Sequence, residues 1–232
     1  RQHLRGPDGA HLFDWPMAYR GGPVRIFQRA ESSSFFGREI GNMYTHAHLR
    51  YAEALWRVGD AEGFCEALSQ IVPIDIKAQV AAAAPRQANC YYSSSDAAFR
   101  DRYRAHADYR RALTGDIPLE GGWRVYSSGA GIATSLILRC LLGLRRSATH
   151  LVVDPLLPAC CDGLRVRLDL YGHPFDIHYQ VGPVGCGPLS LTLNGVDLPF
   201  RRLDNPYRTG GVEVPRARIL ERLGEAPGCL TV

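Results

Sequence analysis

The sequence of 232 residues lacks the features of several protein classes. It has no apolar run near the roughly 18 residues that a membrane-spanning helix needs, and no charged-then-apolar leader at its start. It has no block of like charge and no basic stripe with interleaved aromatics, and its net charge is only +4. These absences exclude a membrane span and argue against nucleic acid as a partner.

Metal-site spacing is also missing. The seven cysteines are odd in number and scattered, no Cys-x-x-Cys occurs, and no Cys/His grouping has the spacing of a zinc site. We therefore expect a reduced, cytoplasmic protein without a metal. Lys77 is the only lysine, which a GC-rich genome explains more simply than oxyanion binding by arginine. Because no initiator Met is present, we interpret the chain as part of a longer protein.

Helical periodicity dominates the first part of the chain. Apolar residues repeat at helical spacing over residues 41–58 and again over 61–71, with Gly59-Asp60 between them, which predicts an αα-hairpin. A short polar helix is expected over 97–111. Residues 130–144 are apolar almost all round, which predicts a helix buried in a larger core.

After residue 150 the pattern changes to alternation with period two, which predicts strands. They are expected at 164–170, 175–181, 189–193, 196–200, 212–214 and 229–232. Asn194-Gly195 between two alternating runs predicts a hairpin. Several antiparallel strands with one apolar face each favour a β-sandwich. The predicted fold is therefore α+β and multidomain, with domains at 1–148 and 149–232.

The segment Ser127-Ser128-Gly129-Ala130-Gly131 leads directly into the apolar helix. The first turn of a helix has N–H groups without an acceptor inside the helix and the positive end of the dipole, so it binds anions. Neither a Walker loop nor the Rossmann fingerprint is present, because the required lysine and third glycine are missing. On spacing alone, an ordinary serine N-cap explains the segment equally well.

Two further segments carry candidate side chains. His46 and His48 are two positions apart on a predicted helix and point about 200° apart, so they are poorly placed to bind one metal. Hydrogen-bonded histidines at the rim of the core are the simpler interpretation. Arg29, Glu31, Arg38 and Glu39 lie among aromatic residues at 27–39, a mixture that suits a sugar site but also a salt-bridged surface loop.

These segments, in this order and ahead of a β-rich tail, resemble glycoside hydrolase family 94, the inverting phosphorylases of cellobiose, chitobiose, cellobionic acid and related β-glucosides. Tyr44-Thr45-His46 matches the family's phosphate-binding helix motif, and residues 125–131 stand where its second phosphate segment lies. Residues 142–144 and 151–155 resemble the entry into the family's C-terminal β domain. Stretches at 28–31, 36–39, 91–96 and 205–208 are most similar to cellobionic acid phosphorylases.

The resemblance implies the last helices of an (α/α)6 barrel followed by a C-terminal antiparallel β-sandwich. It implies phosphate binding by His46, Ser127, Ser128 and Gly129, and substrate binding by Arg29, Glu31, Arg38 and Glu39. An arginine-rich subsite fits the carboxylate of a sugar acid. Ser127 stands where the family usually has Thr and keeps its hydroxyl, whereas Ser128 stands where Gly is usual and narrows the approach to the backbone.

The implied activity is phosphorolysis of a β-glucosidic disaccharide, of the cellobionic acid or cellobiose type, to α-glucose 1-phosphate. Inorganic phosphate is the co-substrate, no other cofactor is expected, and the full-length protein is expected to be a homodimer. The general acid is an Asp expected upstream, because nothing before Gly22 resembles it, so the chain alone is expected to be inactive. An inverting hydrolase on the same barrel and a non-catalytic carbohydrate-binding module are the alternatives.

Overall fold

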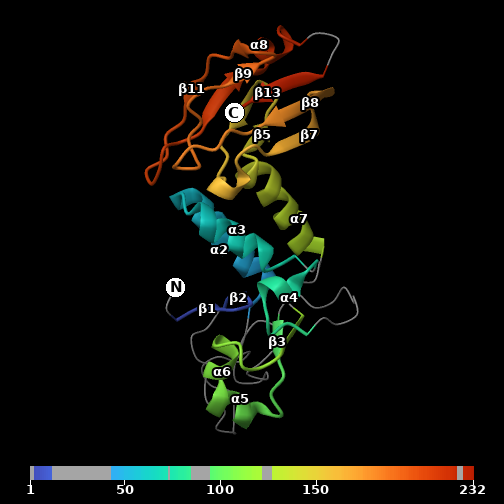
Figure 1. Ribbon diagram of the computed structural model, residues 1–232, viewed down its shortest axis with the longest axis vertical. Helices are drawn as coiled ribbons and strands as arrows, with labels where there is room; N and C mark the ends of the chain where they lie inside the picture. Colours follow the sequence, from blue (N-terminus) through green and yellow to red (C-terminus); the bar gives the residue numbers. More distant parts are fainter. Residues whose placement is uncertain (1–2, 12–42, 73, 85–94, 122–126, 224–226) are drawn as a thin grey trace. The chain divides into compact units, whose positions relative to one another are not determined.

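The computed structural model describes residues 3–11, 43–72, 74–84, 95–121, 127–223 and 227–232 (Figure 1). The chain divides into two compact units. Unit 1 comprises residues 1–52 and 66–133, and unit 2 comprises 53–65 and 134–232. This division differs from the predicted boundary after residue 148, because unit 2 also includes residues 53–65 and 134–148. The domain ranges 1–148 and 149–232 stay a prediction.

The predicted αα-hairpin is confirmed as α2 (Thr45–Val58) and α3 (Ala61–Ser69). Gly59 joins them with a φ of 86°, in the left-handed region that favours glycine. Its N–H bonds the carbonyls of Leu55 and Trp56 at the end of α2. Asp60 then starts α3 by accepting a hydrogen bond from the N–H of Gly63 at 2.9 Å, as an N-cap residue does.

Unit 1 also contains two small pairs of strands. β1 (Arg5–Gly6) pairs antiparallel with β2 (Gly9–Ala10), and β3 (Ser95–Ala97) pairs antiparallel with β4 (Leu119–Gly121). A small apolar cluster surrounds the second pair and the short helix α4 (Ile76–Gln79); its buried members are Ile76, Val80, Ala83, Ala97, Ala112, Ile117 and Leu119.

The helix predicted over 97–111 is instead two short helices, α5 (Arg102–Asp108) and α6 (Arg110–Leu113). The prediction of its start was wrong because Asp101 caps α5, accepting hydrogen bonds from the N–H groups of Tyr103 and Arg104. The residues before Asp101 belong to β3 and the turn after it.

The apolar helix is α7 (Ser127–Leu136), which continues as a π-helical turn, η1 (Ile137–Leu141). The chain then enters β5 (Leu144–Arg146), so the predicted helix over 130–144 ends three residues early. Among the described residues, Leu136 and Cys140 are buried, whereas Ile137 and Leu138 are 40% and 43% exposed. The burial of this helix in a larger core stays a prediction.

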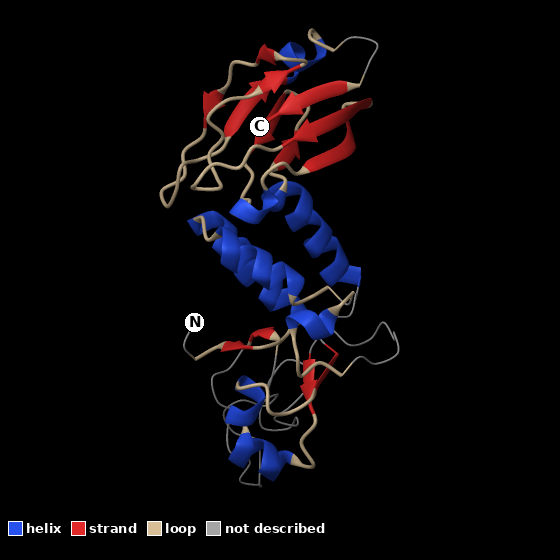
Figure 2. Ribbon diagram, viewed as in Figure 1, coloured by secondary structure: helices blue, strands red, loops and turns tan. Residues whose placement is uncertain are grey.

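Unit 2 contains two sheets (Figure 2). One has the order β10-β9-β13-β8-β7, made of Val196–Asp197, Thr192–Leu193, Gly228–Thr231, His173–His178 and Arg165–Leu170. The other has the order β11-β12-β6-β5, in which β11 is Arg201–Arg202, β12 is Val212–Pro215 and β6 is His150–Val153. A 3-10 turn, η2 (Ala159–Cys161), and helix α8 (Arg216–Leu220) complete the unit.

Buried side chains of both sheets form one apolar cluster. It includes Phe175, Ile177, Leu193 and Leu230 from the five-stranded sheet, and Leu151, Val153, Val212 and Val214 from the four-stranded one. The prediction that all strands are antiparallel was wrong for one pair, because β13 lies parallel to β8. The α+β class is confirmed, whereas the (α/α)6 barrel and the sandwich stay predictions.

Candidate anion-binding site at two helix starts

Helix α7 begins at Ser127, as its sequence predicts. Ser127, Ser128 and Gly129 form its first turn, and no acidic residue lies there. The side chains of Ser127 and Ser128 are outside what the structure describes. Gly129 is buried, so the backbone of this turn lies inside unit 1.

The second helix start is that of α2, where Thr45 is the first helical residue. Thr45 is 4% exposed, and the neighbouring His46 is half-buried. The ring of His46 lies nearly parallel to that of Tyr44, with their centroids 6.2 Å apart. This stacking holds the imidazole beside the first turn of α2, which likewise has no acidic residue.

The two helix starts meet. A Cβ atom built on Gly129 would lie 3.4 Å from Cγ2 of Thr45, which is ordinary van der Waals contact. The first turns of α2 and α7 are therefore neighbours, although about 80 residues separate them in sequence. Each first turn presents N–H groups and the positive end of a helix dipole, so two of them side by side favour an anion. A side chain at position 129 would lie in the space between the two helix starts.

His48 faces away from His46, as their spacing of two residues predicts. Its side chain is fully buried. Nδ1 accepts a hydrogen bond from the N–H of Ala10 at 2.9 Å, and Nε2 donates to the carbonyl of Ala67 at 2.7 Å. Burial lowers the pKa of His48 below its usual value of 6.5. His48 is thus a neutral core histidine, and the simpler interpretation of it is confirmed.

The sequence did not single out a buried polar pair beside His48. Asp8 and His11 are 0% and 4% exposed, and Oδ1 of Asp8 lies 2.6 Å from Nε2 of His11. Nδ1 of His11 lies 3.1 Å from the hydroxyl of Tyr109, and Oδ2 of Asp8 accepts from the N–H of Met43 at 3.4 Å. The only signal in the sequence was the Pro7-Asp8-Gly9 turn, which marks a hairpin but not a network.

The predicted sugar-binding residues fall in a segment that the structure does not describe. Arg29, Glu31, Arg38 and Glu39 lie outside the described residues, and so does the rest of 12–42. Within the described ranges, no three His, Cys, Asp or Glu side chains gather so that they could hold a metal ion. Among the helices that the structure describes, none has the length and apolarity of a membrane span.

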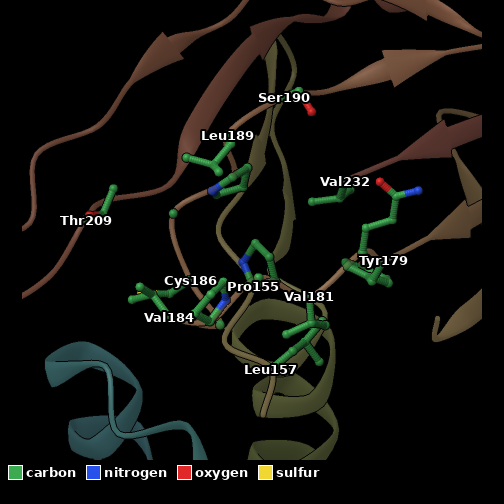
Figure 3. A pocket seen from close by; sticks show the side chains of 16 residues that line it. Pro155, Leu157, Tyr179, Val181, Val184, Cys186, Leu189, Ser190, Thr209 and Val232 are labelled. Carbon is green, nitrogen blue, oxygen red and sulfur yellow. The ribbon is translucent and has the colours of Figure 1, made fainter. Parts of the chain in front are cut away.

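Unit 2 has a cavity of about 300 Å³ beside the loop at 182–190 (Figure 3). Its wall is mainly apolar, with Leu157, Val181 and Val184 among the lining residues. Tyr179 also lines it, but its hydroxyl donates to the carbonyl of Leu142 at 2.8 Å, and burial raises its pKa. The titratable side chains in its wall are Tyr179 and Cys186, so the cavity lacks the carboxylate and histidine side chains that acid–base chemistry at neutral pH most often uses.

Comparison with known proteins identifies the β-rich C-terminal part of the chain as a known kind of domain. Residues 143–224 match the glycoside phosphorylase C-terminal domain, and the match begins where the chain leaves η1 for the sheets. The chain is 42% identical over 224 residues to a 1,2-beta-oligoglucan phosphorylase of Listeria innocua serovar 6a (strain ATCC BAA-680 / CLIP 11262). That alignment covers 97% of this chain and 20% of the relative, so the chain spans about a fifth of the relative's length.

These matches confirm the resemblance to glycoside phosphorylases that the motifs predicted. They do not support the cellobionic acid subgroup, since the relative is described as acting on a 1,2-β-linked oligoglucan.

Proposed function

We propose that this chain is part of a glycoside phosphorylase that cleaves a β-linked glucan with inorganic phosphate and releases α-glucose 1-phosphate. The observation that carries the proposal is the contact between the starts of α2 and α7, through Thr45 and Gly129. The matches to a phosphorylase domain and to an oligoglucan phosphorylase support phosphate as the anion.

The proposed mechanism follows from the charge of the nucleophile. An inverting glycosidase needs an acid for the leaving oxygen and a base to activate water. A phosphorylase needs only the acid, because phosphate is already an anion. The chain's contribution is then to hold phosphate below the anomeric carbon, with N–H groups of both first turns and a hydrogen bond from His46. Ser127 and Ser128 add hydroxyl donors at the start of α7.

The general acid stays a prediction: an Asp that lies elsewhere in the full-length protein. We also propose phosphate as the only co-substrate, a homodimer as the assembled form and the cytoplasm as the location. Arg29, Glu31, Arg38 and Glu39 are proposed to hold the sugar on the acceptor side.

For the substrate, we propose a 1,2-β-linked glucose oligosaccharide, because the relative that aligns over nearly the whole chain is described by that activity. Cellobionic acid and cellobiose remain the alternatives from sequence. The two classes differ in charge: a sugar acid uses arginine for its carboxylate, whereas a neutral glucan uses arginine for hydroxyl groups.

The test uses the full-length enzyme with 1,2-β-linked glucan oligosaccharides, cellobiose and cellobionic acid. Glucose 1-phosphate release is measured with and without phosphate. We expect phosphate-dependent release from the 1,2-β-linked glucan, and a loss of at least about 100-fold in kcat/KM for phosphate in His46→Ala, because one donor to the reacting anion is removed. His173→Ala, at an exposed histidine of β8, is the matched control and should keep wild-type activity.

Each alternative has its own result. Release of free glucose without phosphate would identify a hydrolase, and binding without turnover would identify a carbohydrate-binding module. Equal activity of His46→Ala and the wild type would refute the assignment of the phosphate site while leaving the phosphorylase activity intact.

A further inference from the structure

The hairpin of β1 and β2 is attached to the helix that carries His46. His48 makes this attachment, because its ring accepts from Ala10 of the hairpin and donates to Ala67 of α3. The two distances, 2.9 and 2.7 Å, are those of well-formed hydrogen bonds. One fully buried side chain thus joins three segments at the first turns of α2.

The hairpin is shaped to fit this ring. Gly9 has a φ of 124°, and a Cβ atom on it would lie 2.7 Å from Cε1 and Nδ1 of His48 and 3.2 Å from Cγ of Met43. No larger residue fits there without moving the imidazole or the hairpin. The close approach of Gly9 therefore fixes how far α2 lies from β2.

A second attachment lies just before α2 begins. Asp8 accepts from the N–H of Met43, and His11 forms an isolated antiparallel bridge with Met43. The carboxylate of Asp8 is in turn held by His11 at 2.6 Å. Gln70, just after α3, donates to the carbonyl of Pro7 at 3.1 Å, so both central residues of the hairpin turn are held by residues next to a helix.

We infer that His48 is a positioning residue for phosphate: by joining α2 to the hairpin and to α3, it fixes where the first turn of α2, with Thr45 and His46, lies beside the first turn of α7. The inference rests on the proposed function. His48 does not touch the anion itself, because it points to the opposite side of α2 from His46.

The ring works in its neutral form, since Nδ1 must stay an acceptor for the N–H of Ala10. Burial has the largest influence on its pKa and favours the neutral form, as do the charges of His11 and Arg5. The Ala67 carbonyl of α3 and the carboxylate of Asp8 act in the opposite direction but are smaller influences than burial, and Tyr51 lies beside the ring on α2 with ring centroids 6.1 Å apart.

The effect on phosphate follows from geometry. Displacing a reacting group by about 1 Å can lower a rate about 100-fold. Phosphate depends on the first turns of two different helices, so a shift of α2 alone separates its ligands. The sugar is proposed to be held by other residues, so the KM for glucan should change much less than the KM for phosphate.

The test compares two substitutions in the full-length enzyme. In His48→Asn the amide oxygen takes the place of Nδ1 and keeps the bond from Ala10, whereas in His48→Gln the amide nitrogen takes the place of Nε2 and keeps only the bond to Ala67. We expect His48→Gln to raise the KM for phosphate at least about tenfold with little change in the KM for glucan. His48→Asn should stay within about threefold of the wild type for both.

Leu119→Ala is the matched control, because Leu119 is fully buried in unit 1 but lies in the cluster around β3 and β4. It should lower the melting temperature without raising the KM for phosphate. If His48→Gln, His48→Asn and Leu119→Ala change the melting temperature alone, His48 has only a structural role and the inference is wrong. The same conclusion follows if the two His48 variants raise the KM for phosphate equally.

If the wild type shows no phosphorolysis at all, the proposed function fails first, and this inference fails with it. A wild type that phosphorolyses glucan beside a His48→Gln variant with an unchanged KM for phosphate refutes the inference alone.

Discussion

Arg208 and Asp154 form a buried ion pair in unit 2. Nη1 of Arg208 lies 2.8 Å from Oδ1 of Asp154, and the two side chains are 4% and 7% exposed. The other carboxylate oxygen of Asp154 lies 3.4 Å from Nη2 of Arg145. Both guanidinium groups lie over the ring of Trp56 in α2, at 5.6 Å for Arg145 and 5.1 Å for Arg208. Arg208 also donates to the carbonyl of Trp56. The last turn of α2 is therefore bonded to the loop between β11 and β12.

Removing Arg208 should therefore destabilise unit 2 strongly. Arg208→Met keeps much of the side-chain volume but leaves a buried carboxylate with only the longer contact to Arg145, which should cost about 3 kcal/mol. Urea unfolding followed by far-UV circular dichroism measures the loss. Arg167→Met is the control, because its pair with Asp176 at 2.7 Å is largely exposed and should contribute nothing measurable. Equal midpoints for the two variants would contradict the assigned role of the buried pair.

Two glycines with the same backbone conformation should differ in their tolerance of alanine. Gly143 and Gly163 have φ values of 71° and 77°, so alanine at either costs about 1–2 kcal/mol of backbone strain. A Cβ on Gly143 would also overlap the backbone of Asp154 and Pro155, whereas nothing lies within 4 Å of a Cβ on Gly163.

We thus expect Gly163→Ala to fold with a modestly lower melting temperature, and Gly143→Ala to lose more than about 4 kcal/mol or fail to fold. Soluble yield and thermal unfolding measure both variants. A Gly143→Ala protein as stable as Gly163→Ala would contradict the close packing of the turn before β5 against Asp154 and Pro155.

Local features of the structure could be predicted from the sequence. Helical stripes and Gly59 predicted α2 and α3, and the Asn194-Gly195 pair predicted a turn whose residues have φ values of 54° and 77°. Strand β5 was missed because Leu144 continues an apolar run that begins inside a helix. The parallel pairing of β13 with β8 was missed because it depends on strands about 50 residues apart, which no local pattern encodes.

In the candidate site, too, local features could be predicted from the sequence and contacts between distant segments could not. The start of α7 at Ser127 follows from its small residues, and the two motifs follow from resemblance. Their contact through Thr45 and Gly129 needed the three-dimensional structure. The network of Asp8, His11 and His48 was missed because it joins a turn and two helices, and each segment alone has an ordinary pattern.

Cys65, which is half-buried, and Cys140, which is buried, should be unreactive in the native protein. Burial raises the pKa of Cys65 and of Cys140 to about 12, so at pH 8 only about one thiol in ten thousand is a thiolate at either position. Cys160 is exposed. Iodoacetamide at pH 8, followed by peptide mass spectrometry, should modify Cys160 first and leave Cys65 and Cys140 unmodified until urea is added. Labelling of Cys65 as fast as Cys160 in the native protein would contradict the raised pKa of its thiol.

Stability should depend on pH through His48. Burial lowers its pKa in the folded state below 6.5, so below pH 6.5 the unfolded chain binds a proton that the folded chain does not. The contribution of His48 is therefore fully present above pH 6.5 and is lost as the pH falls toward the folded-state pKa. Urea midpoints of the wild type and of His48→Asn between pH 7.5 and 5.5 measure it. We expect the wild type to lose more stability than the variant over this range, and parallel curves would refute the prediction.

Gly129 and Gly131 allow a direct test of whether the start of α7 binds an anion. Both are helical glycines, so alanine at either should stabilise α7 by about 0.5–1 kcal/mol. Their surroundings differ, because a Cβ on Gly129 would touch Thr45 at 3.4 Å and one on Gly131 would meet nothing within 4 Å.

In the full-length enzyme we expect Gly129→Ala to raise the KM for phosphate several-fold without loss of stability, because the methyl group occupies the space between the two helix starts. Gly131→Ala should gain the same helix stability with an unchanged KM for phosphate. Initial rates at varied phosphate, together with melting temperatures, separate the two effects. An unchanged KM in both variants would show that phosphate does not approach the backbone at Gly129, and the site would then have to lie elsewhere on α2.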